Sequence, residues 1–467
     1  MARPTEKGHA LNMARWSMKD QSSPGSASDL NRREFLRSAA VAGAGLMVTW
    51  PGWAQEQAGA STKADELRVA FIGPGSQGRN LLTQCLKIPG IRFTAICDIW
   101  PYHQEYAANI LKKYEQIVKV YTDYQELLAQ EQDLDAAIVA TPDWVHAEQA
   151  IACLKAGLHV YCEKEMANTL DSARKMVQAA RDTKKLLQIG HQRRSNPRYW
   201  HALKMINNDK ILGRITHIGG QWNRSQRFDL GWPEGKELAA AALKKYGYDT
   251  MDRFRNWRWY KQYSGGPMAD LGSHQVDVFN WFLAAPPAGV LATGGLDNYE
   301  DREWYDNVLA LYEYKVDGKN VRGSYEVLNT TSYGGFFETF MGNEGSLMIS
   351  EDSRKGFIFR EQEAKRREWE DEASKVETMG RDAIELKIGE TLRPDGTKDP
   401  EGQRLLEESQ KPPHQLHLEN FFNAIRNGTP LSCPPEVAYE TAVSVLKANE
   451  AVEKGCRIEF KPEEFKV

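Results

Sequence analysis

The stretch Gly73-Pro74-Gly75-Ser76-Gln77-Gly78 decides the fold of this chain, because of what surrounds it. It follows an apolar run over residues 67–72, which is typical of a buried strand, and precedes a run over 80–86 that predicts a helix. A second predicted strand, over 93–97, ends in Asp98, twenty residues after the last glycine. Strand, glycines, helix, strand and acid in this order predict a unit that binds a dinucleotide.

Each glycine of the stretch has a physical role in such a unit. Gly73 permits a tight turn, Gly75 lets the backbone approach a pyrophosphate, and Gly78 lets the helix pack closely on the strand. The helix N-terminus, reached through Ser76 and Gln77, offers unpaired N–H groups and a positive dipole end to the phosphates. Without that context, a glycine-rich turn would be no more than a loop.

Asp98 indicates which dinucleotide is bound. Its carboxylate would accept hydrogen bonds from the adenosine ribose hydroxyls, and its charge would repel a 2′-phosphate. The sequence therefore predicts NAD as cofactor in preference to NADP.

Short apolar runs and amphipathic stretches alternate over residues 63–190, which predicts a doubly wound α/β domain. Its parallel sheet would carry helices on both faces and bind ligands at the carboxyl ends of its strands. Thr141-Pro142 and Glu163-Lys164 follow two further predicted strands and therefore occupy such ends. The predicted cofactor-binding residues are Gly73, Gly75, Ser76, Gln77, Gly78, Asp98, Thr141, Pro142, His146, Glu163 and Lys164.

Residues 191–467 predict a second α/β domain with a large, open and mostly antiparallel sheet. One face would be covered by helices and the other left free to pair subunits, so we expect a homo-oligomer, a dimer or a tetramer. Residues 351–411 are highly charged and poor in apolar residues, which indicates a solvated insertion. The β-rich runs cover 215–222, 289–294, 308–314, 321–327 and 336–340, and the closing helices cover 416–426 and 438–454.

Residues 1–62 predict a leader and linker outside the folded domains. Asn31-Arg32-Arg33-Glu34-Phe35-Leu36-Arg37 resembles a twin-arginine export motif, and an apolar stretch over 39–48 follows, too short for a membrane span. This route exports folded proteins, so we expect a periplasmic or extracellular protein that keeps its dinucleotide. A disordered basic tail, or an uncleaved amphipathic anchor, is the alternative.

Composition narrows the possible partners. Beyond residue 60 the chain has 53 basic and 59 acidic side chains, a net charge of −6, and no basic stripe. We therefore expect neither nucleic acid nor an anionic membrane as partner. The six cysteines show no C-x-x-C pairing, and the histidines form no metal-ligand set, so neither a disulfide framework nor a metal is predicted.

Two clusters could carry chemistry. Lys164 ends a predicted strand, where a lysine can hydrogen-bond a substrate hydroxyl and stabilise a developing alkoxide. Asp270 and His274 are four residues apart, so on a helix they would share a face. A histidine oriented by a carboxylate is a suitable base for a hydroxyl proton. A surface lysine and a helix-start capping pair are the alternatives.

Together these motifs resemble the Gfo/Idh/MocA family of oxidoreductases. The similarity rests on the glycine stretch, Thr141-Pro142, Glu163-Lys164, and Gly265-Gly266 followed by Asp270-x-x-x-His274-x-x-Asp277. It implies a Rossmann domain, an α/β domain, and Lys164, Asp270 and His274 as catalytic residues acting on sugars, inositols or related polyols. The family usually has Glu-Lys-Pro, whereas this chain has Glu165, which we expect to loosen the backbone and add a negative charge.

The resemblance leaves the reaction open. The leading interpretation is dehydrogenation of a sugar, glycoside or polyol hydroxyl, which intact Asp270 and His274 favour. The alternatives are a glycosidase that oxidises its substrate transiently, with NAD not consumed, and a binding protein without turnover. The predicted substrate-binding residues are Arg194, Trp257, Arg258, Tyr260 and Asp277, with Arg224 and Arg227 as further candidates.

Overall fold

The structure is a computed structural model that describes residues 66–225, 229–367, 370, 373–388 and 400–467. The predicted leader and linker, residues 1–62, lie outside the described residues, as does Arg227. No helix in the described ranges is both long enough and apolar enough to span a bilayer.

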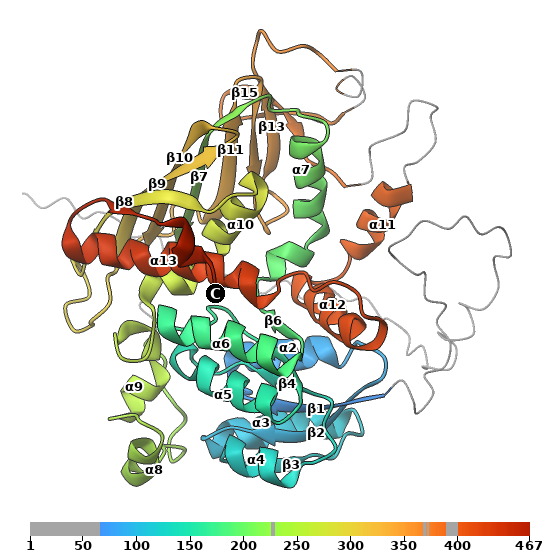
Figure 1. Cartoon of the computed structure of the whole chain (residues 1–467), viewed down its shortest axis with the longest axis vertical. Helices are drawn as coiled ribbons and strands as arrows, with labels where there is room; N and C mark the ends of the chain where they lie inside the picture. Colours follow the sequence, from blue (N-terminus) through green and yellow to red (C-terminus); the bar gives the residue numbers. More distant parts are fainter. Residues whose placement is uncertain (1–65, 226–228, 368–369, 371–372, 389–399) are drawn as a thin grey trace, which may run out of the picture. The chain divides into compact units, whose positions relative to one another are not determined.

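The first sheet is the predicted parallel sheet (Figure 1). Its six strands lie in the order β3-β2-β1-β4-β5-β6, and every neighbouring pair is parallel. This order and the helices between the strands are those of a doubly wound fold, as expected. The strands are β1 (Leu67–Ile72), β2 (Ile91–Cys97), β3 (Lys119–Tyr121), β4 (Ala136–Val139), β5 (His159–Cys162) and β6 (Leu187–Ile189), and the helices are α2 (Ser76–Cys85), α3 (Pro101–Lys113), α4 (Tyr124–Gln130), α5 (Asp143–Lys155) and α6 (Leu170–Thr183).

A helix from the far end of the chain completes one face of this sheet. Leu418, Phe421 and Phe422 of α12 (Pro413–Asn427) pack in one apolar cluster with Phe71 and Tyr161 of the central strands. All five side chains are fully buried. The core of the nucleotide-binding half is therefore built from residues more than 200 positions apart.

The second sheet is large, open and mostly antiparallel, as predicted (Figure 1). Its order is β14-β15-β13-β12-β11-β7-β10-β9-β8-β16; β7 and β10 are parallel, and the other described pairs are antiparallel. The strands are β7 (Ile215–Asn223), β8 (Pro287–Gly295), β9 (Asn307–Val316), β10 (Lys319–Leu328), β11 (Phe336–Gly342), β12 (Gly345–Ile349), β13 (Gly356–Arg360), β14 (Lys375–Thr378), β15 (Arg381–Glu385) and β16 (Ile458–Glu459), and the helices are α7 (Pro197–Asn207), α8 (Ala240–Lys245), α9 (Met251–Arg255), α10 (Ser273–Leu283), α11 (Pro400–Glu408) and α13 (Pro435–Lys454).

The charged segment 351–411 is not simply a solvated insertion. It holds β13, β14 and β15, which extend the large sheet, and α11. Ile358, Ile384 and Leu405 from this segment are buried. The prediction failed because it rested on average composition: the few apolar residues of β15, Ala383 and Ile384, are buried, while Arg381 and Asp382 stay exposed.

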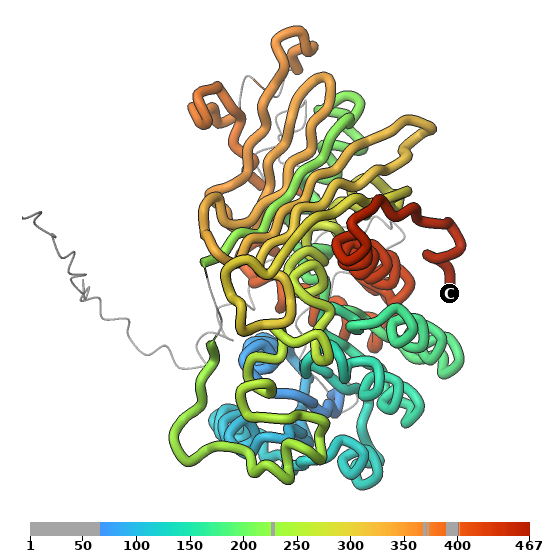
Figure 2. Tube along the Cα trace, turned by 90° about the vertical axis from the view of Figure 1, so that its left-hand side faces the viewer, coloured from blue at the N-terminus to red at the C-terminus, as the bar shows by residue number. Residues whose placement is uncertain are grey.

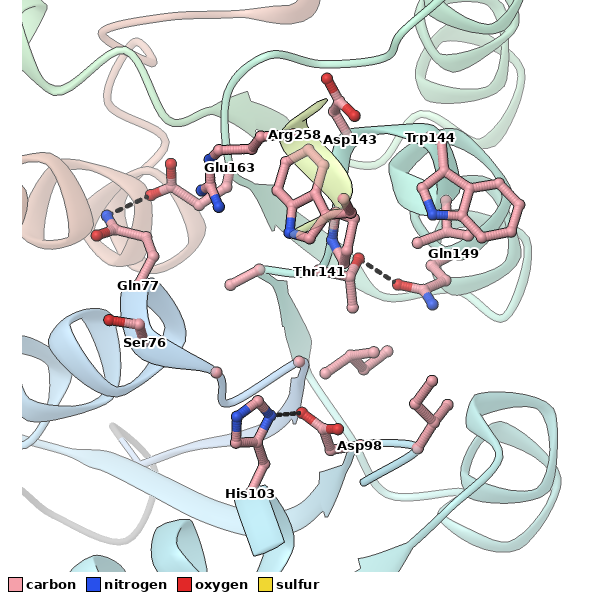
Figure 3. A pocket seen from close by; sticks show the side chains of 18 of the residues that line it. Ser76, Gln77, Asp98, His103, Thr141, Asp143, Trp144, Gln149, Glu163 and Arg258 are labelled. Atoms are coloured by element: carbon pink, nitrogen blue, oxygen red, sulfur yellow. Dashed lines mark hydrogen bonds and ion pairs between the residues drawn. The ribbon is translucent and has the colours of Figure 1, made fainter. Parts of the chain in front are cut away.

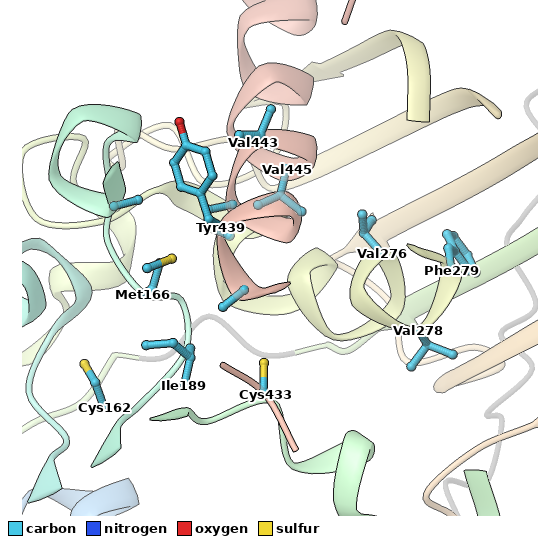
Figure 4. Packing of buried hydrophobic residues seen from close by; sticks show 14 of the residues in the cluster. Cys162, Met166, Ile189, Val276, Val278, Phe279, Cys433, Tyr439, Val443 and Val445 are labelled. Atoms are coloured by element: carbon cyan, nitrogen blue, oxygen red, sulfur yellow. The ribbon is translucent and has the colours of Figure 1, made fainter. Parts of the chain in front are cut away.

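The two sheets share one apolar core (Figure 4). Cys162 and Ile189 at the ends of β5 and β6 join the same cluster as Phe279 of α10 and Tyr439 and Val443 of α13. This packing fixes the carboxyl edge of the parallel sheet against α10. Four cysteines of the nucleotide-binding half, Cys85, Cys97, Cys153 and Cys162, are buried thiols.

Candidate functional site

A cleft of about 1020 Å³ runs along the carboxyl ends of β1, β2, β4 and β5 (Figure 3). Its volume is at the upper limit of ordinary ligand pockets, as an extended ligand requires. Nearly all predicted cofactor-binding residues line it: Gly73, Gly75, Ser76, Gln77, Asp98, Thr141, Pro142, Glu163 and Lys164.

The glycine turn between β1 and α2 fits a pyrophosphate. Gly73 has a φ of +82°, and a Cβ there would lie 2.6 Å from a Thr141 methyl carbon. Gly78 does not line the cleft, but a Cβ there would lie 2.2 Å from the carbonyl oxygen of Gly73, so it sets the close packing predicted for it. No side chain caps the N-terminus of α2, and its first turn has no acidic residue. The N–H groups of this turn remain available to an anion.

Asp98 lies at the end of β2 with its carboxylate held in place from two sides. The backbone N–H of Trp100 donates to Oδ1 at 2.8 Å, and His103 Nδ1 lies 3.0 Å from Oδ2. The carboxylate is only 9% exposed but lines the cleft, where ribose hydroxyls would meet it. Sequence reasoning missed His103, whose only signal was its position at the start of α3.

The choice of cofactor can be tested at Asp98. We expect Asp98→Ala to weaken NAD binding by about tenfold or more, because hydrogen bonds to a charged group contribute ~1.5–3 kcal/mol, and to weaken NADP binding less. Equilibrium titration with each dinucleotide measures this ratio. An unchanged NAD-to-NADP preference would remove Asp98 from the ribose site.

Residues at the ends of β4 and β5 fix the middle of the cleft. The hydroxyl of Thr141 donates to Gln149 Oε1 at 2.7 Å (Figure 3), and Pro142 is the N-cap residue of α5. On the other side, Gln77 Nε2 donates to Glu163 Oε1 at 3.3 Å (Figure 3). These bonds join the glycine turn to the segment that carries Lys164.

His146 was predicted to bind the cofactor, but its side chain does not reach the cleft. The imidazole is buried and does not line the cleft; Nδ1 lies 2.8 Å from the carbonyl oxygen of Glu165, and Nε2 lies 2.6 Å from that of Thr141. Helix α5 turns this side chain inward, beneath the loops. His146 therefore ties together two loops that line the cleft.

Asp270 lies between three cations. Lys164 Nζ donates to the backbone carbonyl of Asp270 and lies 3.5 Å from its Oδ1. Arg258 Nε donates to Oδ1 at 3.1 Å, and Arg224 donates to Oδ2 at 3.2 Å. Burial alone would raise the pKa of Asp270, but Arg258, Lys164 and Arg224 outweigh it and hold this pKa well below its usual range. The carboxylate is therefore charged at any physiological pH.

His274 lines the same cleft as Lys164 but makes no hydrogen bond to Asp270 within the described part of the chain. The predicted single helix is instead a π-helical turn (Met268–Gly272) followed by α10, and the salt bridges draw Asp270 away. The expectation that Asp270 orients His274 is thus wrong. The imidazole packs against Trp222, with ring centroids 5.2 Å apart.

Burial, followed by the positive charges of Lys164 and Arg193, lowers the pKa of His274 well below its usual value. The imidazole is therefore neutral near pH 7. It is 8% exposed, and its Nδ1 has no hydrogen-bond partner among the described residues. A neutral imidazole at the wall of a cleft can accept a proton from a ligand on a ring nitrogen that faces the cleft.

The predicted substrate-binding residues divide into two groups. Trp257 and Arg258 line the cleft. Arg194 and Asp277 do not; they form a buried ion pair, with Arg194 Nε 2.9 Å from Asp277 Oδ2. Tyr260 is also buried away from the cleft and donates to Asp252. Sequence position alone cannot distinguish a side chain facing the cleft from one facing the core.

Several residues that line the cleft belong to no sequence motif and were not predicted. Trp222 at the end of β7, Gln192 after β6, and Glu351 after β12 come from three separate segments, and Gln192 Nε2 donates to Glu351 Oε1 at 3.2 Å. His414 of α12 lies 3.2 Å from Gln77, between Nε2 atoms. The strand-end positions of Trp222 and Gln192 were the only sequence signal.

Glu165 differs from the expectation that it would loosen the backbone and add a charge. Its side chain is 1% exposed, and Oε1 accepts a hydrogen bond from Met166 N at 2.8 Å. Burial raises the pKa of this carboxyl to about 8, so it is protonated at pH 7. It therefore adds no negative charge beside Lys164 at neutral pH.

This raised pKa predicts a pH-dependent stability. The folded protein holds a proton on Glu165 that the unfolded chain releases from about pH 4.5. Protonated Glu165 therefore stabilises the folded state at low pH, and this stabilisation is lost as pH rises toward 8. In the natural protein we expect the free energy of unfolding to fall by on the order of 2–4 kcal/mol between pH 5 and 8 because of Glu165. In Glu165→Gln this part of the fall should be absent. Urea denaturation of both proteins across this range measures the difference, and parallel curves would contradict the assignment.

Comparison with known proteins identifies the family. The model "Oxidoreductase family, NAD-binding Rossmann fold" matches residues 67–191, and "Oxidoreductase family, C-terminal alpha/beta domain" matches residues 236–460. The chain belongs to the Gfo/Idh/MocA oxidoreductase family. Its parallel sheet is accordingly an NAD-binding Rossmann domain, as the glycine stretch and Asp98 predicted.

Similar proteins in this family differ in activity. The chain is 32% identical to a glycosyl hydrolase family 109 protein of Shewanella baltica, over 56% of this chain and 60% of that one. It is 32% identical to an inositol 2-dehydrogenase/D-chiro-inositol 3-dehydrogenase of Shouchella clausii, over 32% of this chain and 42% of that one. The chain thus spans roughly half the length of these curated relatives. A levoglucosan dehydrogenase structure with NADH and levoglucosan shares the fold, with a TM-score of 0.63, 20% identity, and coverage of 85% and 99%.

Proposed function

We propose that this protein is an NAD-dependent oxidoreductase that transfers hydride between its cofactor and a CH–OH group of a sugar, glycoside or polyol. The observation that carries the proposal is that Lys164 and His274 line the same cleft as the glycine turn and Asp98. Relatives named as inositol dehydrogenase and levoglucosan dehydrogenase support this substrate class.

The chemistry divides between cofactor and protein. When bound, NAD supplies the acceptor for the hydride. His274, neutral at pH 7, accepts the hydroxyl proton, and Lys164 stabilises the developing alkoxide. Asp270 holds the ammonium of Lys164 in the cleft and balances the charge of Arg258.

The outer cleft suits a polyhydroxylated ring. Trp222 and Trp257 line the cleft, where aromatic rings suit the apolar side of a sugar. Gln192 and Glu351 offer acceptors and donors for hydroxyls, and the side chain of Arg258 is 36% exposed. The substrate-binding roles of Trp257 and Arg258 belong to this proposal.

An NAD-dependent glycosidase is the second candidate. It is supported by the glycosyl hydrolase family 109 relative, which matches over half of this chain. In that reaction, oxidation of one carbon acidifies a neighbouring C–H, the glycosidic bond is eliminated, water adds, and the ketone is reduced. His274 and Lys164 would carry out the oxidation and reduction steps in the same way.

The decisive experiment begins with the purified protein. Denaturation and assay of released NAD(H) establishes what it carries, and incubation with aryl glycosides and with free polyols then separates the candidates. Ketone without release of the aryl alcohol supports dehydrogenation, whereas release that requires NAD supports the glycosidase. Neither product, from any substrate in the panel, would overturn both and leave a binding protein.

We also propose that the protein is exported folded by the twin-arginine route to the periplasm or cell exterior. The support is the Arg32-Arg33 motif and the apolar stretch over 39–48. Replacing both arginines with lysine is expected to leave the protein in the cytoplasm, where cell fractionation would find it.

The homo-oligomer remains a proposal as well. Leu309 and Leu311 on β9 and Leu291 on β8 are 48%, 57% and 44% exposed, on a face of the large sheet. An apolar face of this kind suits a second copy of the same sheet. Light scattering of the purified protein gives its state directly, and a monomer would overturn the proposal.

A further inference from the structure

Residues 229–263 leave the C-terminal half of the chain and pack along the Rossmann domain. This segment, here called the strap, follows β7 after the undescribed residues 226–228, contains α8 and α9, and leads back to the π-helical turn before α10. Figure 1 shows α8 and α9 beside the nucleotide-binding half, and Figure 2 shows the same yellow-green segment against it. The Rossmann motifs give no reason for such a covering.

Aromatic side chains attach the strap to the Rossmann domain. Trp100, just after β2, donates from Nε1 to the carbonyl of Lys236 and meets the ring of Phe254 edge-on, with centroids 5.8 Å apart. Trp144 of α5 donates to the hydroxyl of Tyr248 at 3.1 Å. Together with Tyr263, these side chains form one apolar cluster. The strap is thus packed on the domain like an interior element.

One part of the strap covers one particular end of the cleft, whereas Arg258, further along the strap, donates to Asp270. Residues 245–248 of the strap line it together with Thr122–Gln125, which follow β3. In the sheet β3 lies beyond β2, on the side of Asp98 away from β1 and the glycine turn. Lys164 lies at the opposite end, after β5. Because Asp98 marks the ribose, the end under the strap is where adenosine would lie.

The strap also brings a cation to this end. Arg255 lines the cleft, with its guanidinium 4.9 Å above the Trp100 ring and its Nε donating to Gly231 O. Arg79, next to the glycine turn, lines the same cleft, and its buried Nη1 has no partner among the described residues. The positive charges of Arg79 and Arg255 oppose each other, and Asp98 offsets this only in part at Arg255, so a further anion would stabilise both guanidiniums. The pyrophosphate of a dinucleotide is such an anion.

We infer that the strap forms the outer wall of the adenosine and pyrophosphate subsite and retains NAD through complete catalytic cycles. Arg255 pairs with the pyrophosphate from the side opposite the glycine turn, and residues 245–248 cover the adenosine. Dissociation then requires the strap to separate from Trp100 and Trp144. This inference goes beyond the proposed function, since it holds for any substrate.

Two variants weaken the strap at different points. Arg255→Ala removes the cation. Gly247→Ala puts a Cβ 2.9 Å from the Trp144 ring, at a φ of +81°, and pushes the strap away from the domain. The matched controls are Arg253→Ala, in the same helix but not lining the cleft, and Gly231→Ala, where a Cβ meets nothing within 4 Å.

The readout is the NADH dissociation rate, measured without substrate. The purified protein is loaded with NADH, and the decay of tryptophan-sensitised nicotinamide fluorescence is followed after excess NAD is added. We expect both variants to release NADH at least about tenfold faster than the natural protein, and both controls to match it within about twofold, since tenfold corresponds to ~1.4 kcal/mol. Gel filtration should strip the variants of nucleotide but not the natural protein.

Two results would overturn the inference: dissociation from both strap variants within about twofold of the natural rate, or loss of NADH from the natural protein during gel filtration. Circular dichroism and thermal melts establish that each variant is folded. Failure of the proposed substrate chemistry would leave these rates unchanged, so the two failures are distinguishable.

Discussion

His274→Ala is expected to lower kcat by ~10²–10⁴-fold, because a positioned base contributes about that much. Its imidazole is neutral and lines the cleft, whereas His103 and His414, which also line it, contact Asp98 and Gln77. Steady-state rates with the substrate found in the panel above measure the loss. NAD binding should change little, since His274 contacts none of the glycine-turn residues.

The pH profile gives an independent check of this role. Burial lowers the pKa of His274, so the base is already deprotonated at pH 7 and the oxidation rate should fall only well below pH 6.5. The acid limb should be absent from His274→Ala. Near-normal turnover in that variant, or a limb that persists unchanged, would contradict the assignment.

Lys164→Ala should lower kcat by ~10²–10³-fold, the cost of removing a donor to a developing oxyanion. The variant also leaves Asp270 to Arg258 and Arg224 alone, so the local charge changes by one unit. Stopped-flow measurement of NADH formation separates this step from product release. Lys155→Ala is the matched control, because that lysine is exposed on α5 and away from the cleft.

Lys164→Arg adds a second comparison. A guanidinium keeps the charge but not the compact ammonium, so partial recovery is expected relative to alanine. If alanine and arginine variants both turn over at the natural rate, Lys164 has no part in the chemistry and its bond to Asp270 is structural only.

The Rossmann half could be predicted almost residue by residue, because its information is local. Each strand is a short apolar run followed by a turn and an amphipathic helix; the predicted strand over 93–97, for example, lies in β2, Ile91–Cys97. The glycine spacing and Asp98 then placed the cofactor. The short strand β3 has no such apolar run, since only Tyr121 of its three residues is buried.

The remaining site could not be predicted because long-range contacts decide it. Asp270 contacts Lys164, Arg224 and Arg258 rather than its helical neighbour His274. It lies in the π-helical turn, which the sequence did not predict. His414 and His417 likewise reach the cleft and the core because α12 packs on the Rossmann sheet.

The packing of α12 has a consequence for protein engineering. A fragment ending near residue 191 would carry the whole nucleotide motif, yet it would lack Leu418, Phe421 and Phe422 and leave Phe71 and Tyr161 open to water. Such a fragment should aggregate when expressed alone. Chimaeras between relatives should therefore exchange α12 together with the N-terminal half, so that each sheet keeps the helix that evolved against it.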